Sequence, residues 1–452
     1  MSESQQPTAA VVGAGLSGLT AAYRLQQQGW VVTVFEADDV VGGRVRTVER
    51  DGYRLDTGAT GLAETYEAYL SLTAELGIRD QIVPASPSIG IYRDGQIHHL
   101  RLDRIALSGL RTKLLSNRAK LRALRLGYDV GLAKLKGRLD YSDMRKAARL
   151  DVRSARDYAT STLGTELSEY LCEPVVRMML IADGDEVSVV ELFSGLANIF
   201  SSRICSLRGG QGRLPKLLAG SLDVRLCCPV EQVADAGDHV EVTWRSADGN
   251  GTATRFDACV ISAPLPVAAE ICPDRASVLG PLNEALGYTQ CLSVAVATRV
   301  PTQSPALVVE LPPREDATVA LMFLNHNKCP DRAPAGRGLI ECCWEARASA
   351  RSFDATDDEI SRRTLATVLR VFPELEGQIE FTHVTRWRRA LPHTRIGSYK
   401  LIGELNARID PNSRIQFAAD YMSAAGQNTA VEFGGRAAAA LTATLRDSTV
   451  AG

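Results

Sequence analysis

The sequence predicts an α/β fold of two interleaved domains, one built on a parallel sheet and one of α+β type. Three observations predict it. Residues 9–35 read as strand, glycine-rich turn, helix and strand. Strand-like runs of a second layer lie between residues 292 and 344. Runs that fit the first sheet return at residues 256–264 and 414–421.

Composition places the chain among globular proteins. It has 452 residues, 45% hydrophobic and 23% charged, which excludes disordered, collagen-like and coiled-coil classes. No apolar run reaches the roughly 18 residues that a membrane-spanning helix needs, and the first residues lack a signal-peptide pattern. We therefore expect a cytoplasmic protein. The net charge of -2 argues against a nucleic-acid partner.

The ten cysteines show no metal-binding pattern. None forms a C-x-x-C pair or lies near a histidine at a zinc spacing. We expect reduced, mostly buried thiols and no metal site.

The first turn carries the motif Gly13-x-Gly15-x-x-Gly18, between a short apolar strand and a helix over residues 19–28. In such a βαβ unit the first glycine makes the tight turn, the second admits a pyrophosphate, and the third lets helix and strand pack closely. The phosphates would bind at the helix N-terminus, where free N–H groups and the helix dipole favour anions. The motif predicts a dinucleotide site.

The second strand, residues 31–35, ends at Glu36, 18 residues after Gly18. A carboxylate at about this distance accepts hydrogen bonds from both hydroxyls of an adenosine ribose. It would repel a 2'-phosphate, so NADP is disfavoured here.

Two further loops of small residues follow. One is Gly42-Gly43-Arg44, and the other spans residues 56–61 (DTGATG). The glycines permit close backbone approach, and Arg44 offers donors to a diphosphate. The loops indicate successive passes of backbone along one elongated cofactor.

Together these motifs resemble the flavin-containing amine oxidase superfamily, which includes monoamine oxidases, protoporphyrinogen oxidases and phytoene desaturases. The resemblance implies FAD as the cofactor and a Rossmann-type FAD-binding domain interleaved with an α+β substrate domain. The FAD-binding domain would comprise residues 1–85, 195–264 and 385–452. The substrate domain would comprise residues 86–194 and 265–384.

The resemblance also implies which residues hold FAD. Asp420 would contact the ribityl-diphosphate region, the Val431 backbone the flavin ring, the Val230 backbone the adenine, and Trp387 would lie beside the ring. Where the family pattern has glycine, this chain has Ala419. No Cys or His lies in residues 421–431, so we expect non-covalent FAD. The full set of predicted FAD contacts is Gly13, Gly15, Leu16, Ser17, Gly18, Glu36, Ala37, Gly43, Arg44, Gly58, Ala59, Thr60, Val230, Trp387, Asp420 and Val431.

The middle of the chain begins with a predicted hairpin around Asp94-Gly95. Residues 101–150 then hold fourteen Lys/Arg and four Asp, a net charge of +10, with leucines at helical spacings. Three interpretations stay open for this segment: a solvated face of amphipathic helices, a peripheral membrane contact, or a surface for acidic ligands. Strands are predicted at residues 292–300, 306–310, 318–324 and 338–344.

Four residues are candidates for catalysis. Glu64 follows the flavin-side loop and is a candidate base or anchor. Arg177 is a candidate anchor for a substrate carboxylate or carbonyl, and Trp344 and Tyr399 are candidate aromatic walls. His326, His383 and His393 show no triad or metal spacing, so we interpret them as structural.

Three functions are compatible with the sequence. The first is an enzyme that transfers a hydride from the C–N bond of an amine or amide, in a small secondary metabolite, to flavin N5, with O2 as acceptor. The second is a porphyrinogen oxidase or carotenoid-type desaturase acting on C–C bonds. The third is a non-catalytic binding protein of the same fold, against which Glu36, Arg44 and Asp420 argue. The oligomeric state is not readable from the sequence.

Overall fold

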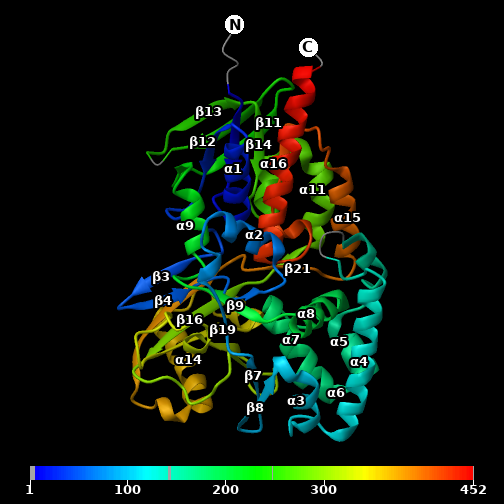
Figure 1. Cartoon of the computed structure of the whole chain (residues 1–452), viewed down its shortest axis with the longest axis vertical. Coiled ribbons are helices and arrows are strands. Elements are labelled where there is room, and N and C mark those ends of the chain that lie inside the picture. The colour runs from blue at the N-terminus through cyan, green and yellow to red at the C-terminus, as the bar shows by residue number, and fades with distance from the viewer. Residues whose placement is uncertain (1–5, 141–143, 247, 451–452) are drawn as a thin grey trace.

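The structure is a computed structural model that describes residues 6–140, 144–246 and 248–450. Figure 1 shows an upper part that contains β14, α1 and α16, and a lower part that contains a larger sheet and a group of helices. The chain passes between the two parts several times, because the strands of each sheet come from distant regions of the sequence.

The upper part contains a five-stranded parallel sheet. Its strand order is β10 (Asp223–Arg225), β2 (Val31–Phe35), β1 (Thr8–Val12), β14 (Ala258–Ile261) and β22 (Ile415–Phe417), and every neighbouring pair is parallel. All the carboxyl ends therefore lie at one edge, where ligands bind in open α/β sheets.

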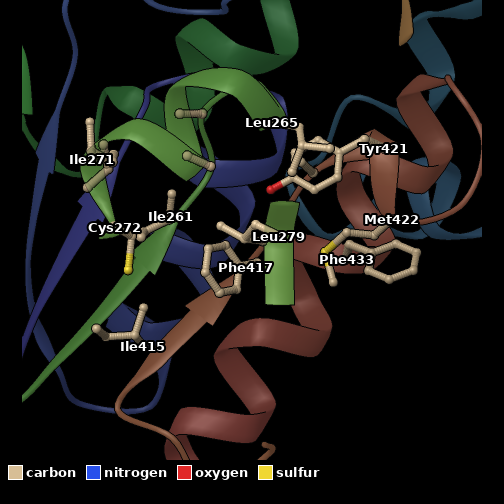
Figure 2. Packing of buried hydrophobic residues seen from close by; sticks show 14 of the residues in the cluster. Ile261, Leu265, Ile271, Cys272, Leu279, Ile415, Phe417, Tyr421, Met422 and Phe433 are labelled. Carbon is tan, nitrogen blue, oxygen red and sulfur yellow. The ribbon is translucent and has the colours of Figure 1, made fainter. Parts of the chain in front are cut away.

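Helices cover both faces of this sheet. On one face α1 (Leu16–Gln27) and α16 (Gln427–Val450) pack through buried residues such as Leu19, Leu25 and Leu441. On the other face α10 (Leu265–Ile271) and α11 (Ala276–Ala285) pack against the strands. Figure 2 shows that core, in which Ile261 and Phe417 of the strands lie beside Leu279.

The lower part contains a seven-stranded mixed sheet. Its order is β20 (Ile379–Trp387), β16 (Cys291–Thr298), β19 (Gly338–Trp344), β18 (Val319–Leu324), β17 (Val308–Glu310), β7 (Ser88–Arg93) and β8 (Gln96–Arg101). The predicted hairpin is confirmed as β7–β8, with Asp94 and Gly95 at φ angles of 52° and 80°. Helix α14 (Asp357–Val371) covers one face through Ile360 and Val368. The opposite face of this seven-stranded sheet lines the candidate active site.

A group of helices lies beside the large sheet (Figure 1). It comprises α3 (Ile105–Arg111), α4 (Asn117–Leu135), α5 (Ala155–Tyr158), α6 (Thr165–Leu167), α7 (Glu173–Leu180) and α8 (Val189–Ser201). Their shared core contains Tyr158 and Phe193 in an edge-to-face contact, with ring centroids 5.0 Å apart.

Shorter elements connect these layers. They are β3 (Thr47–Arg50), β4 (Tyr53–Asp56), β5 (Leu62–Ala63), α2 (Glu67–Glu75), β6 (Ile82–Pro84), β9 (Ile204–Leu207), α9 (Arg213–Ala219), β11 (Val230–Asp235), β12 (Val240–Arg245), β13 (Gly251–Phe256), β15 (Gly287–Tyr288), α12 (Asn325–Lys328), α13 (Ala346–Arg351), β21 (Pro392–His393) and α15 (Ser398–Arg408). All ten cysteines are free, and all except Cys227 are buried, which confirms the expectation for the thiols. No helix among the described residues has the length and apolar character needed to cross a membrane.

Candidate active site

The loop between β1 and α1 forms the glycine-rich turn. Gly13 has a φ angle of 100°, and its N–H donates to the Phe35 carbonyl at 2.8 Å. A Cβ atom on Gly18 would lie 2.1 Å from the Gly13 carbonyl oxygen, whereas a Cβ atom on Gly15 would meet nothing within 4 Å. Helix and strand therefore pack too closely for a side chain at Gly18. The space in front of Gly15, at the N-terminus of α1, is open to an anionic group.

Glu36 lies at the carboxyl end of β2, beside this turn. Its Oε2 atom accepts from the Ala14 N–H at 2.7 Å, and its Oε1 atom accepts from the Asp38 N–H at 2.9 Å. Burial raises the pKa of Glu36, and the two backbone hydrogen bonds oppose this by lowering it. Each carboxylate oxygen has a further acceptor site, so the group can still accept from ribose hydroxyls.

The second glycine loop packs directly on the first turn. The Gly42 N–H donates to the Ala14 carbonyl at 2.8 Å, and a Cβ atom on Gly43 would lie 3.2 Å from the Gly15 Cα atom. Next in this loop, the Arg44 guanidinium donates to Asp420 Oδ1 at 2.9 Å. Two predicted cofactor residues from opposite ends of the chain therefore form an ion pair beside the glycine loops.

The third loop is fixed by Trp387 at the end of β20. The Trp387 indole N–H donates to the Thr57 carbonyl at 2.6 Å. A Cβ atom on Gly58 would lie 2.1 Å from the Arg44 carbonyl oxygen, so a larger residue at Gly58 would displace the loop. Gly58, Ala59 and Trp387 thus form one wall beside the second loop.

The C-terminal motif lies at the same edge of the parallel sheet. Ala419 has extended backbone (φ -155°), and both Ala419 and Asp420 line the cavity. Helix α16 begins nearby, and Ala430 in its first turn also lines the cavity. Val431 lies instead in the apolar cluster under α1, so only its backbone is available for the predicted flavin contact.

A cavity of about 1160 Å³ joins these loops to the large sheet. Fourteen of the sixteen predicted FAD contacts line it, the exceptions being Gly18 and Val431. The wall expected to face the substrate, here called the substrate-side wall, comprises Met178, Met179, Ile181, Cys291, Ser293, Leu307, Leu321, Phe323, Lys328 and Cys343. The cavity thus extends from the nucleotide turn into the space between the two parts.

Two of the four candidate catalytic residues, Glu64 and Arg177, do not line this cavity. Glu64 is at the surface, with its side chain 46% exposed and its Oε2 atom 4.0 Å from Arg203 Nε. Arg177 is buried in α7, where its Nε and Nη2 atoms donate to Asp183 Oδ1 at 3.1 and 2.6 Å. The helix turns the neighbouring Met178, rather than Arg177, toward the cavity.

The two residues expected to form aromatic walls, Trp344 and Tyr399, do not line the cavity either. Trp344 points to the face of β19 covered by α14, where its indole N–H donates to Thr364 Oγ1 at 2.8 Å. Tyr399 is buried at the start of α15, and its hydroxyl donates to Glu191 Oε1 at 2.8 Å. The expectation that they line the pocket is therefore corrected: both rings fill protein cores, and the neighbouring Cys343 faces the cavity instead.

A polar group that no sequence motif indicated lies at the cavity floor. The Ser293 hydroxyl donates to the buried carboxylate of Glu341, and Lys328 donates to Asp56 Oδ2 at 2.9 Å. Burial raises the pKa of Glu341 to about 7. A signal existed for Glu341, the single charged residue of the apolar run Gly338–Trp344, whereas Lys328 lies in a segment without a pattern. His383, which we interpreted as structural, also lines the cavity.

A parallel sheet with a cavity at its carboxyl edge defines the class of nucleotide-cofactor-binding α/β proteins. A sequence profile described as flavin containing amine oxidoreductase matches residues 16–442, so the chain belongs to this family. It is an FAD-dependent oxidoreductase, as the sequence predicted.

Similar proteins include porphyrinogen oxidases and amine oxidases. Protoporphyrinogen oxidase 2 of Arabidopsis thaliana is 27% identical over 85% of this chain and 83% of that protein. Coproporphyrinogen III oxidase of Bacillus subtilis is 22% identical over 87% of this chain and 89% of that protein. The structure of cyclohexylamine oxidase from Brevibacterium oxydans matches with a TM-score of 0.78 at 19% identity, over 98% of this chain and 100% of that chain. The likeness to solved structures confirms the fold.

The residues present fit FAD. The open space at Gly15 suits a pyrophosphate, Glu36 suits the adenosine ribose, and the Arg44–Asp420 pair suits the ribityl-diphosphate region. When bound, FAD supplies an acceptor for two electrons from a substrate. The protein's part is to bind and orient both molecules and to exclude water.

Proposed function

We propose that this enzyme oxidises the C–N bond of a small, predominantly apolar amine or amide. The substrate would pass a hydride from the carbon beside nitrogen to flavin N5, and O2 would reoxidise the cofactor. The observation that carries the proposal is the apolar character of the substrate-side wall, where side chains such as Leu307, Leu321 and Phe323 face the cavity.

The distribution of acidic residues supports a neutral amine as the bound form. Among the described residues that line the cavity, the carboxylates are Glu36, Asp38 and Asp420, and all three lie at the cofactor motifs. An ammonium ion on the substrate side would lose its hydration without a carboxylate to pair with, which is costly. The apolar wall therefore favours the deprotonated amine, whose nitrogen lone pair assists hydride departure.

Ser293 is the polar group placed to orient such a substrate. Its hydroxyl lines the cavity and is held by Glu341 on the neighbouring strand β19. Lys328 also lines the cavity, but its ammonium group is engaged by Asp56. The chain thus provides one fixed hydroxyl in an apolar wall, an arrangement that orients a C–H bond toward a planar acceptor.

A second candidate function is porphyrinogen oxidation. Arg388 and Arg389 line the cavity, and Arg388 is paired only loosely, with Asp354 at 3.6 Å. Guanidinium groups are the favoured partners of carboxylates such as those carried by porphyrinogens. The names of the curated relatives point in the same direction.

Anaerobic mixing of the purified yellow protein with a substrate panel tests the proposal. The panel should contain alkyl and aryl amines, amides, coproporphyrinogen, protoporphyrinogen and a carotenoid precursor, and the readout is loss of the oxidised-flavin absorbance band. We expect bleaching by amines or amides and peroxide formation in air. Bleaching by porphyrinogens alone would overturn the proposal. Flavin that stays with the chain after acid precipitation would contradict the expected non-covalent binding.

An arginine variant separates the two candidate functions further. Arg388→Gln should leave amine oxidation within about twofold of the unmodified enzyme, because an exposed ion pair contributes little. If a porphyrinogen carboxylate binds this guanidinium, the same variant should lower kcat/KM for porphyrinogen by roughly tenfold or more. Arg351→Gln, at the exposed end of α13, is the matched control.

A further inference from the structure

We propose that helices α3 and α4 form a docking surface for an anionic lipid bilayer, independently of which substrate the enzyme oxidises. Fourteen large hydrophobic side chains are exposed among the described residues, and six of them lie within residues 107–135. These six, with their exposed fractions, are Leu107 (45%), Leu110 (73%), Leu121 (69%), Leu124 (72%), Tyr128 (63%) and Leu135 (85%). Such clustering marks a contact surface rather than scattered surface residues.

The exposed side chains of α4 form one stripe. At about 100° per residue, Leu121, Leu124, Tyr128 and Leu135 fall within roughly 60° of one another around the helix axis. The buried residues of α4 lie on the opposite side and contribute to the helical core; they are Ala119, Leu126, Val130 and Ala133. Helix α4 is therefore apolar on two opposite faces, and packing within the chain accounts for only one of them.

Basic side chains flank the stripe on both sides. By the same helical geometry, Arg118 and Arg125 lie along one side, and Lys120 and Lys134 lie along the other. The acidic residue Asp129 lies outside the arginine row, toward the buried face of α4, and accepts from Arg125 at 2.9 Å and from the Tyr158 hydroxyl at 2.8 Å. An apolar stripe between two rows of basic residues is the pattern of a helix that lies in the interface of an anionic membrane.

The positive surface continues beyond the end of α4. A recess there is lined by five basic residues, Lys136, Arg138, Arg145, Lys146 and Arg149. Phosphate-bearing lipid headgroups have the charge to occupy such a recess. Figure 1 shows α4 at the outer edge of the lower part, away from the parallel sheet. Because the apolar stripe is bordered by basic side chains on both sides, an anionic lipid surface suits it better than an apolar partner helix.

Vesicle flotation of the purified holoprotein tests the proposal. We expect the protein to float with vesicles of phosphatidylcholine and phosphatidylglycerol and to remain in solution with phosphatidylcholine alone. Leu124→Asn should lower partitioning into the mixed vesicles by roughly tenfold, because a leucine loses its place in the lipid. The matched control is Leu217→Asn on α9, where an exposed leucine lies outside the surface and should not affect binding.

A second variant tests the charge contribution. Arg118→Gln combined with Lys134→Gln should lower partitioning about twenty-fivefold, since each basic residue near an anionic surface strengthens binding by roughly fivefold. Flavin content and the thermal unfolding midpoint verify that each variant is folded. Three outcomes overturn the proposal: no flotation with mixed vesicles, an equal loss in the Leu217→Asn control, or capture by polyglutamate without vesicle binding. The last would indicate an acidic protein partner.

Discussion

The carboxyl group of Glu341 couples protein stability to pH. Burial raises the pKa of Glu341 to about 7 from an ordinary value of 4.5, so the folded protein holds this proton where the unfolded chain has released it. Folding stability should therefore fall as pH rises from 4.5 to 7, by about 3 kcal/mol from this group. Glu341→Gln removes the dependence. Urea unfolding of the holoprotein across this range, compared with the unmodified chain, measures the difference.

A matched control is available on another strand. Glu241→Gln on β12 removes an exposed carboxyl group, and its unfolding midpoints should follow those of the unmodified protein at every pH. If the free energy of unfolding depends on pH in the same way for Glu341→Gln and the unmodified protein, Glu341 ionises like an exposed glutamate. In that case a negative charge lies behind Ser293 at the cavity wall, and a neutral amine loses its advantage there.

Site residues that belong to a continuous sequence motif were predictable. Site residues whose role depends on the direction of a side chain were not. The spacing from Gly13 to Glu36 predicts a nucleotide turn because strand, turn and helix are adjacent in sequence. Trp344 and Cys343 are neighbours on one strand, so their side chains point to opposite faces, and the sequence alone does not predict which side chain faces the cavity. Both faces of β19 are buried, so apolar composition gives no help.

At the scale of elements, the contact between α1 and α16 is sensitive to a single methyl group. A Cβ atom on Gly434 would lie 2.4 Å from the Ser17 carbonyl oxygen and 3.0 Å from the Thr20 Cβ atom. Gly434→Ala should push the helices apart and destabilise the protein by about 1–3 kcal/mol. The affinity of this variant for FAD should fall as well, because Ser17 also lines the cavity. Urea unfolding and titration of the apoprotein with FAD measure the two effects.

The adjacent residue provides the control. A Cβ atom on Gly435 would meet nothing within 4 Å, so Gly435→Ala introduces no clash. Since alanine is the better helix former, this variant should be more stable by roughly 0.5–1 kcal/mol. Equal destabilisation by both substitutions would show that close packing of α16 on α1 at Gly434 is not what limits the size of the residue there.

Most strands were predictable as elements, although their partners were not. The apolar runs at residues 292–300 and 338–344 became β16 and β19, which pair in an antiparallel register. The order of the seven-stranded sheet places β7 beside β17, and those two strands are separated by more than 200 residues. Such pairing depends on the burial of whole faces, which one sequence does not reveal.

At the scale of the whole molecule, a buried ion cluster joins the cofactor loops to the large sheet. Asp56, at the end of β4, accepts from Lys328 at 2.9 Å and from Arg332 Nε at 3.0 Å. Its other oxygen accepts from the Thr47 hydroxyl at 2.7 Å and the Gln211 N–H at 2.9 Å. Sequence motifs placed Asp56 in a cofactor loop, but its cationic partners lie more than 270 residues away.

This cluster should make the two parts of the molecule unfold together. Asp56→Asn leaves Lys328 and Arg332 buried without their counter-ion, and should cost about 3–5 kcal/mol in urea unfolding. Glu75→Gln, which breaks the exposed pair with Arg24, should cost less than about 1 kcal/mol. Adding Lys328→Met to Asp56→Asn should recover part of the loss, because one uncompensated charge is removed.

Acid unfolding gives the same cluster a second test. Burial alone would raise the pKa of Asp56, but the charges of Lys328 and Arg332 hold it below the ordinary value of 3.8. The stability that Asp56 contributes is thus fully present above pH 3.8 and is lost as pH falls through the lower pKa of the folded state. Asp56→Asn, stabilised if necessary by Gly435→Ala, should therefore show a shallower loss of stability on acidification, measured by circular dichroism and by flavin release. If the variant and the unmodified protein release flavin and unfold with the same acid dependence, the cluster is not what couples the cofactor loops to the sheet.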